Sequence, residues 1–258
     1  MKSKTMNRIV CFGMMVSLVC AVNVSALTYV WEGTTAGDDW QVADNWDLNG
    51  LPVYTTDTVK INTLPGATLY SGTAGAYSLQ LGNAGFEGRL DVYGGSLQAP
   101  GGLDIGQGIG GTGTVNIYDG THSARYIVVG VDGNGTFNMY DGFFRVTNAL
   151  RIGYRSGGTG HVNLDGGTLS IKGIYMPFAN STMEINNGVL LYDGDMTPAT
   201  SYLNVNGIDT GKVYAAEGKQ LVMEYDSVTN QTAIYAIPEP ATLALLAAGA
   251  LGFIRKRK

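Results

Sequence analysis

Apolar and polar residues alternate with a period of two in five aligned eight-residue segments in the middle of the chain. The apolar third and fifth positions are Leu90/Val92, Val115/Ile117, Phe137/Met139, Val162/Leu164 and Met183/Ile185. The polar fourth position is Asp91, Asn116, Asn138, Asn163 and Glu184. The eighth position is always glycine: Gly95, Gly120, Gly142, Gly167 and Gly188. This pattern predicts strands with one buried face, each followed by a turn with positive φ.

Two further registers of apolar pairs repeat together with the first. One consists of Leu79/Leu81, Leu103/Ile105, Ile127/Val129, Leu150/Ile152 and Ile174/Met176. The first members of these pairs are 24, 24, 23 and 24 residues apart. The weaker register consists of Leu97/Ala99, His122/Ala124, Phe144/Val146, Leu169/Ile171 and Leu190/Tyr192. Each unit of about 24 residues therefore contains three short strands, and it buries its apolar faces only by stacking on its neighbours.

The repeat predicts an all-β fold, a right-handed parallel β-helix (β-solenoid) of about four to six coils over residues 79–195. Because like positions of coils about 4.8 Å apart lie above one another, the apolar pairs should form an interior column and the asparagines an exterior ladder. An antiparallel sandwich or jelly roll is the alternative, since it also has strands about eight residues apart. The 24-residue period favours the solenoid, because a sandwich gives no reason for it.

The segments that flank the repeat are predicted to cap the two ends of the solenoid. Residues 27–78 contain all three tryptophans of the chain: Trp31, Trp40 and Trp46. Bulky aromatic residues can cover the first coil, and a sugar-stacking platform is the other interpretation of them. Residues 221–225 and 231–235 predict a terminal hairpin within a C-terminal β cap at 196–236.

Both ends of the chain have the features of an exported protein. A cationic start, an apolar stretch and small residues predict a secretory signal peptide over residues 1–26, cut after Ala26. Near the other end, Pro238-Glu239-Pro240 precedes an apolar run of 14 residues, 241–254. The chain then ends in the basic residues Arg255, Lys256, Arg257 and Lys258. The prolines should hold the motif extended and open to an enzyme, while the basic tail stays on the cytoplasmic side.

As a helix, the apolar run would be about 21 Å long against a hydrocarbon core of about 30 Å. It is therefore marginal as a permanent membrane anchor and adequate as a transient one.

This three-part pattern, over residues 237–258, resembles the PEP-CTERM sorting domain. The resemblance implies export through the inner membrane, processing near the Pro-Glu-Pro by an exosortase (a membrane-embedded cysteine transpeptidase), and membrane contact through the C-terminal helix. It also implies a destination at the cell surface or in the extracellular matrix, as in a biofilm, of a Gram-negative-type bacterium that makes exopolysaccharide. The repeat at roughly 79–190 is similar to one found in autotransporter passengers and other PEP-CTERM proteins.

Charge and cysteine content narrow the chemistry open to the exported body, residues 27–237. The body has nine basic and 20 acidic residues, which gives it a net charge of −11. This charge argues against nucleic acid or an anionic membrane surface as a partner. Cys11 and Cys20 both lie in the leader, so the body can form no disulfide, thiolate nucleophile or cysteine metal site.

A polysaccharide lyase or glycosidase of the parallel β-helix type is the alternative function, and it requires converging carboxylates. Asp119 and Asp141 occupy one position on adjacent coils, and Asp165 lies one position earlier. All three lie in turns, where aspartate favours the bend by bonding its own backbone. The Asp132-Gly-Asn-Gly135 segment has few ligands for Ca²⁺. We expect no catalytic residue, no metal site and no cofactor.

The remaining candidates are basic residues and histidines. Four of the nine basic residues of the body lie close together in the sequence: Arg125, Arg145, Arg151 and Arg155. They could form a stripe for an anionic glycan, although pairing with nearby acids on solvated faces is the interpretation we favour. His122 occupies an apolar register position and is expected to be a hydrogen-bonded wall residue, whereas His161 lies beside a turn.

Together these features predict a non-enzymatic, exported β-solenoid that acts as a structural or adhesive component. Its expected partners are the exosortase and an exopolysaccharide or other surface glycan. A long repetitive face suits many weak contacts with a polymer better than one precise site. A bare spacer is a third hypothesis, and the sequence does not separate it from the first.

Overall fold

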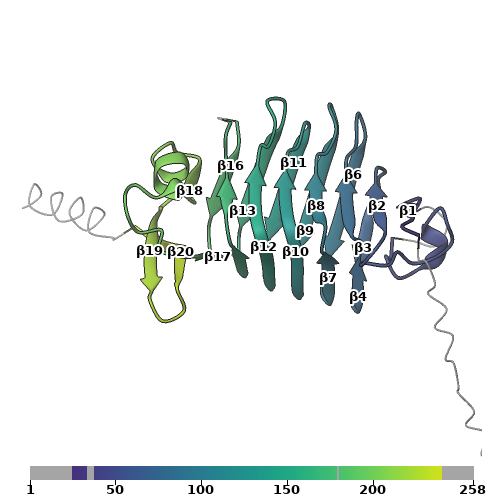
Figure 1. The fold of residues 1–258 in the computed structure, drawn as a ribbon, viewed down its shortest axis with the longest axis horizontal. Helices are drawn as coiled ribbons and strands as arrows, with labels where there is room; N and C mark the ends of the chain where they lie inside the picture. Colours follow the sequence, from purple (N-terminus) through teal and green to yellow (C-terminus); the bar gives the residue numbers. More distant parts are fainter. Residues whose placement is uncertain (1–24, 34–37, 179, 240–258) are drawn as a thin grey trace, which may run out of the picture.

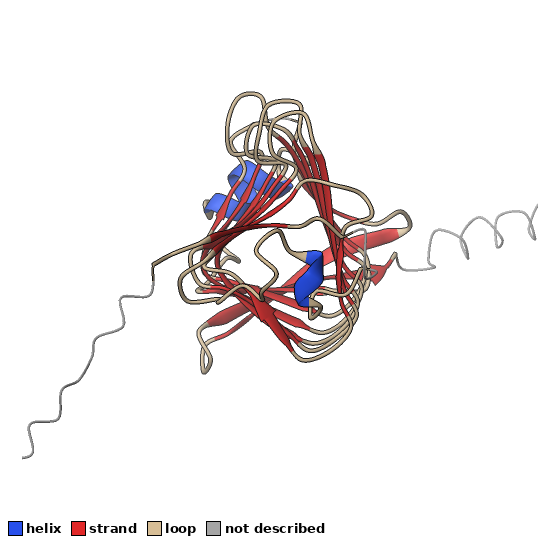
Figure 2. Cartoon of the chain, turned by 90° about the vertical axis from the view of Figure 1, so that its right-hand side faces the viewer, coloured by secondary structure: helices blue, strands red, loops and turns tan. Residues whose placement is uncertain are grey.

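The computed structural model describes residues 25–33, 38–178 and 180–239, and its regular structure is almost entirely β. The strands wind into a parallel β-solenoid of about six coils, which stack side by side along the long axis of the molecule (Figure 1). Viewed along that axis, the coils form a cross-section with three sides (Figure 2). Each coil contributes one strand to each side, as the three apolar registers predict.

The first two faces run almost the whole length of the solenoid. The first face consists of β1 (Thr28–Val30), β2 (Thr58–Ile61), β5 (Ser78–Leu81), β8 (Gly102–Ile105), the second halves of β10 (Thr121–Val129) and β12 (Phe143–Ile152), and β15 (Ile174–Tyr175). The second face consists of β3 (Ala67–Leu69), β6 (Glu87–Val92), β9 (Thr112–Ile117), β11 (Asn134–Met139), β13 (Thr159–Leu164), β16 (Thr182–Ile185) and β18 (Val213–Ala215). All strand pairs within these two faces are parallel.

The third face is parallel until its last two strands. Its parallel part consists of β4 (Thr73–Gly75), β7 (Ser96–Ala99), the first halves of β10 and β12, β14 (Thr168–Ile171) and β17 (Val189–Asp193). β20 (Gln231–Pro238) then pairs with β17 in the antiparallel sense, and β19 (Lys219–Asp226) pairs with β20 in the same sense. Parallel pairing of like positions in successive coils confirms the solenoid and excludes the sandwich and jelly roll.

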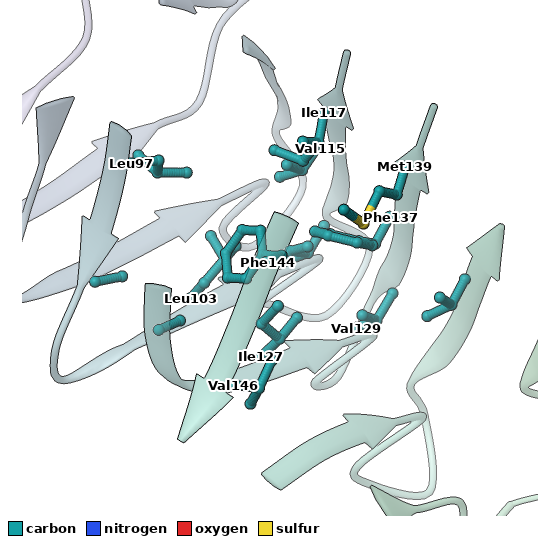
Figure 3. Packing of buried hydrophobic residues seen from close by; sticks show 14 of the residues in the cluster. Leu97, Leu103, Val115, Ile117, Ile127, Val129, Phe137, Met139, Phe144 and Val146 are labelled. Carbon is teal, nitrogen blue, oxygen red and sulfur yellow. The ribbon is translucent and has the colours of Figure 1, made fainter. Parts of the chain in front are cut away.

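The core is an interior column to which all three faces contribute. Leu103, Phe137 and Phe144 come from the first, second and third face, and the side chains of all three are fully buried (Figure 3). The rings of Phe137 and Phe144 meet edge to face, with centroids 5.7 Å apart. Burial of an aliphatic or phenyl side chain contributes about 1.5–3 kcal/mol, so this column is the main source of stability in a body without cysteine.

The polar fourth positions form the predicted exterior ladder. The side-chain amide of Asn116 donates to Asp91 at 2.6 Å, that of Asn138 donates to Asn116 at 2.7 Å, and that of Asn163 donates to Asn138 at 2.7 Å. The amides of Asn116 and Asn138 both donate and accept, which asparagine allows and a carboxylate does not. The ladder therefore fixes the axial register of the second face from outside, while the apolar pairs fix it from inside.

Glycine at the eighth position has positive φ in four of the five segments: Gly95, Gly120, Gly142 and Gly167. Gly188 differs, because its φ lies outside the left-handed region. A Cβ at Gly188 would collide with the carbonyl oxygen of Gly166. Close packing of the backbones, rather than φ, therefore requires glycine at this position.

The three faces begin earlier in the chain than residue 79. The strands β2, β3 and β4 already form a complete coil, with Val59 and Ile61 fully buried. Val59 lies only 20 residues before its counterpart Leu79. Because of this shorter spacing, the coil does not fit the 24-residue repeat and is not recognised from it.

The three tryptophans are buried against the first coil. The exposed fraction of Trp31, Trp40 and Trp46 is 1 % or less, and Trp46 packs edge-on against the other two with centroids 4.9 and 4.7 Å away. The indole N–H of Trp46 donates to the carbonyl of Trp40 at 3.0 Å, beside the 3-10 helix η1 (Ala43–Asn45). Because the ring faces are covered, the sugar-stacking interpretation of these residues is wrong.

The opposite end is closed by the predicted hairpin and by a helical segment that the apolar pattern of the chain does not predict. After β17, the π-helix η2 (Asn204–Ile208) precedes β18, the last strand of the second face. The hairpin of β19 and β20 follows and turns the third face antiparallel (Figure 1). A further parallel coil cannot continue this hairpin, so it ends the stack.

Candidate binding groove and sorting motif

A groove of about 510 Å³ runs across several coils, between the outward side of the first face and the turns that follow it. Asp104 on β8, Val128 on β10 and Arg151 on β12 line its floor. These three residues are neighbours in register, so they form one row across successive coils. The turns after these strands contribute Gln107, Asp132, Tyr154 and Arg155.

Arginine and tyrosine side chains lie over one another in this groove and beside it. The guanidinium of Arg151 lies 4.8 Å from the ring centroid of Tyr126 and 4.7 Å from that of Tyr154. Arg125 also lies over Tyr126, at 5.0 Å. Cation–π contacts hold a guanidinium in place while leaving its N–H donors free for an acceptor, and each contributes about 0.5–1 kcal/mol at exposed positions.

Asn148 and Arg125 line a second hollow, of about 290 Å³. The side-chain amide of Asn148 donates to the Tyr126 hydroxyl at 3.0 Å. Three of the nine basic residues of the body therefore gather along one strip of a strongly acidic surface.

Acidic side chains lie beside these cations in the groove. Burial raises the pKa of the Asp104 carboxyl, and the charges of Arg151 and Arg155 oppose that rise. Asp132 pairs with Arg155 at 2.8 Å, in a pair whose arginine is 62 % exposed. An exposed pair of this kind contributes little to stability, so a competing ligand can replace it at low cost. The groove thus offers both guanidinium donors and carboxylate acceptors.

The four arginines singled out in the sequence do not behave alike. Arg145 forms a two-pronged ion pair with Asp193, at 2.7 and 3.2 Å, and also donates to Ser170 on β14. Arg155 is paired with Asp132, whereas Arg125 and Arg151 contact aromatic rings. Two of the four arginines therefore pair with acidic residues, and the other two lie over tyrosine rings.

The turn aspartates divide in a similar way. The carboxylates of Asp119 and Asp141 accept the N–H of the following glycine, at 2.6 and 2.7 Å, as expected for Asp-Gly turns. Asp165 instead accepts from the side-chain amide of Asn186, at 3.2 Å. Among the residues that the structure describes, no cluster of three or more His, Cys, Asp or Glu side chains could hold a metal ion.

His122 is the hydrogen-bonded wall residue that its register position predicts. Its side chain is buried between Leu97 and Phe144 in the third face. Nδ1 accepts the Leu97 N–H at 3.0 Å, and Nε2 lies 3.0 Å from the carbonyl of Asp119, to which it therefore donates. Burial lowers the pKa of His122, while the Asp119 contacts partly oppose the shift. The ring is accordingly neutral, with its proton on Nε2.

The start of the sorting motif lies at the end of β20. Pro238 pairs with Lys219 of β19, and the N–H of Glu239 donates to the carbonyl of Gly218 at 2.9 Å. Pro238 and Glu239 are therefore extended, but both are paired with β19 or the residue before it. Pro240, the apolar run 241–254 and the basic residues 255–258 lie outside the described residues, as does most of the expected signal peptide. No helix in the described ranges has the length and apolar character needed to cross a membrane.

The comparison with protein families decides the nature of this C-terminal segment. Residues 236–258 match the PEP-CTERM protein-sorting motif. The PEP-CTERM motif implies that the protein is exported across the membrane toward the cell surface and is processed by an exosortase. No curated protein and no solved structure matches the chain.

The apolar registers alone do not reveal the partners of the arginines in and beside the groove. Tyr126, Tyr154 and Asp104 are not in any of the aligned apolar registers, because their side chains point outward from the first face or its turns. A signal was nevertheless present. With a 23-to-24-residue period, Asp104, Val128 and Arg151 occupy one position on consecutive coils, so they could have been placed side by side.

Proposed function

We propose that this exported, PEP-CTERM-sorted solenoid binds exopolysaccharide or another surface glycan as a non-enzymatic structural or adhesive component. It would do so in the extracellular matrix or on the surface of a Gram-negative-type bacterium, after exosortase processing. The groove over β8, β10 and β12 is the contact that recognises the glycan.

The observation that carries the proposal is the position of Arg151, which lines the open groove together with Tyr154 and lies over the rings of both Tyr154 and Tyr126. Tyrosine rings offer apolar area for a sugar face and a hydroxyl for its polar edge. Guanidinium groups form two parallel hydrogen bonds with carboxylates, and carboxylates such as Asp132 accept from sugar hydroxyls. The groove crosses successive coils, so its chemistry suits an extended polymer rather than a compact metabolite.

The non-enzymatic part of the proposal is supported by the contacts of the acidic residues. Asp119 and Asp141 are bonded to their own turns, and Asp132 is paired with Arg155. A glycosidase needs one protonated and one ionised carboxyl flanking the scissile bond. The carboxylates named here serve the backbone or a cation instead.

The test uses the exported protein with a panel of acidic and neutral polysaccharides. Retention on each polymer and release of new reducing or unsaturated ends are measured together. We expect retention without product. Replacing Arg151→Gln should weaken binding about tenfold, the equivalent of about 1.4 kcal/mol for one lost charge-assisted contact.

Arg89→Gln is the matched control, since Arg89 carries the same charge but pairs with Asp91 on β6 of the second face. It should bind like the unaltered protein. Equal losses in both variants would reveal unspecific attraction rather than a groove. Product release would favour the lyase or glycosidase alternative, and failure to retain any polymer would leave the spacer hypothesis.

A further inference from the structure

Among the residues that the structure describes, Leu27 is the first with hydrogen bonds on both sides of its Cα. Its carbonyl accepts the N–H of Thr58 at 2.8 Å, and its N–H donates to the carboxylate of Asp57 at 3.1 Å. Ala26, directly before it, is exposed and forms none of the hydrogen bonds seen for its neighbour. Leu27, the residue that would follow signal-peptide cleavage after Ala26, is therefore bonded to the body of the fold.

Asp57 is the unusual partner in this contact. Its residue is only 2 % exposed, and its carboxylate also accepts the Val53 N–H at 2.7 Å and the Thr56 hydroxyl at 3.0 Å. The three side-chain ion pairs of the described residues are Arg89–Asp91, Arg145–Asp193 and Arg155–Asp132, so none of them neutralises Asp57. A buried carboxylate with neutral donors alone is costly, and an opposite charge within reach would stabilise it.

We infer that the mature chain begins at Leu27 and that its new α-ammonium group forms an ion pair with the buried carboxylate of Asp57. Hydrolysis of the Ala26–Leu27 amide by the signal peptidase consumes one water molecule and breaks the C–N bond. It leaves a carboxylate on Ala26 and an ammonium on Leu27. A neutral donor is thereby replaced by a cation at the same place, and a charge-assisted bond is about twice as strong as a neutral one. Removal of the leader therefore stabilises the pairing of β1 with β2 in the first coil.

Two other charged residues, Lys60 and Asp47, lie beside β1. β1 packs beside β2, which contributes Lys60, and the N–H of Val30 donates to the carboxylate of Asp47 at 2.9 Å. Asp47 thus serves the other end of β1, while Asp57 serves Leu27. An ammonium paired with a carboxylate has a raised pKa, so its stabilising effect is present below the ordinary α-amino pKa of about 8 and is lost as the pH rises beyond the raised value.

The test compares four exported, full-length proteins in a double-mutant cycle. One has the natural sequence, the second carries a Gly-Ser insertion between Ala26 and Leu27, the third carries Asp57→Asn, and the fourth carries both changes. Intact mass of the natural protein should place its N-terminus at Leu27. At pH 7 the insertion should lower the melting temperature by about 3–6 °C when Asp57 is present, and by much less in the Asp57→Asn background.

Two measurements keep the inference falsifiable if Asp57→Asn folds poorly. The insertion should have little effect at pH 10.5, where the amine is neutral, and the α-amino pKa of the natural protein, from the pH dependence of its acylation rate, should be raised. An N-terminus other than Leu27, or an insertion effect that is equal at pH 7 and pH 10.5, would overturn the inference.

Discussion

At the level of single residues, His122 shows how a polar side chain can occupy an apolar column. Both ring nitrogens have backbone partners, Leu97 and Asp119, and the ring packs against Phe144 with centroids 5.5 Å apart. The hydrogen bonds remove most of the cost of burying the neutral ring, but they require the proton on Nε2. Protonation of Nδ1 would place a donor against the Leu97 N–H.

The stability of the fold should consequently depend on the charge of His122. Because burial lowers its pKa from the ordinary value of 6.5, the unfolded chain binds more protons than the folded one below that pH. Stability should fall as the pH drops below about 6.5, until the lowered folded-state pKa is passed. The free energy of unfolding, measured by urea denaturation from pH 7.5 to 5.5, reports this slope.

His122→Phe should remove that slope and cost about 1–3 kcal/mol at pH 7.5, because Leu97 and Asp119 lose their partner. His161→Phe, on the exposed side of β13, is the matched control and should keep the slope. A slope that survives in His122→Phe would assign the titration to another group.

At the level of elements, the hairpin of β19 and β20 links the solenoid to the sorting motif. Gly218 and Glu239 form a hydrogen-bonded pair, so the alternation of an antiparallel ladder makes Lys219 and Pro238 a non-hydrogen-bonded pair. Pro238 lacks an N–H, and here none is needed. β17 pairs with β20 only as far as Tyr235, so the end of β20 is held by β19 alone.

Processing of the PEP-CTERM motif should therefore require the end of β20 to separate from β19. Gln220→Pro removes the N–H that faces Ile237 in the next hydrogen-bonded pair, and it should accelerate cleavage in cells that contain the exosortase. Gln220→Ala keeps the N–H and is the control. The measurement is the rate of mass loss of newly exported protein, and equal rates in all three proteins would show that release of β20 does not limit processing.

At the level of the whole molecule, the two ends of the solenoid are covered by different structures. The last apolar layer at each end has no neighbouring coil, so it must be covered or it will pair with another molecule. The N-terminal end is covered by Trp31, Trp40 and Trp46, and the C-terminal end by the helical segment and the hairpin.

Loss of the tryptophan cap should therefore cause association as well as instability. Trp46→Ala should cost about 3–5 kcal/mol and expose the first coil, giving a mass that rises with protein concentration in light scattering. Phe137→Ala, in the middle of the column, should cost a similar amount without association. Association of both variants alike would attribute it to partial unfolding rather than to the uncovered end.

The features that depend on local period can be read from the amino-acid sequence alone. Strand alternation and the 24-residue spacing predict three faces, their register, the interior column and the asparagine ladder, because stacked coils place like positions above one another. The export and sorting signals are equally local. The sequence also placed the tryptophans in a cap, since a solenoid end must be covered.

Which outward side chains meet, and where the regular pattern stops, is visible only in the three-dimensional fold. Arg151 between Tyr126 and Tyr154, and Leu27 against Asp57, join residues from different coils or turns. The repeat period determines on which face and in which coil a residue lies. Contacts between outward side chains depend instead on turn geometry and side-chain direction, which vary from coil to coil. The 20-residue first coil and the pairing of Pro238 with β19 likewise depend on packing at the two ends of the solenoid. At each end one side of the last coil has no neighbouring coil.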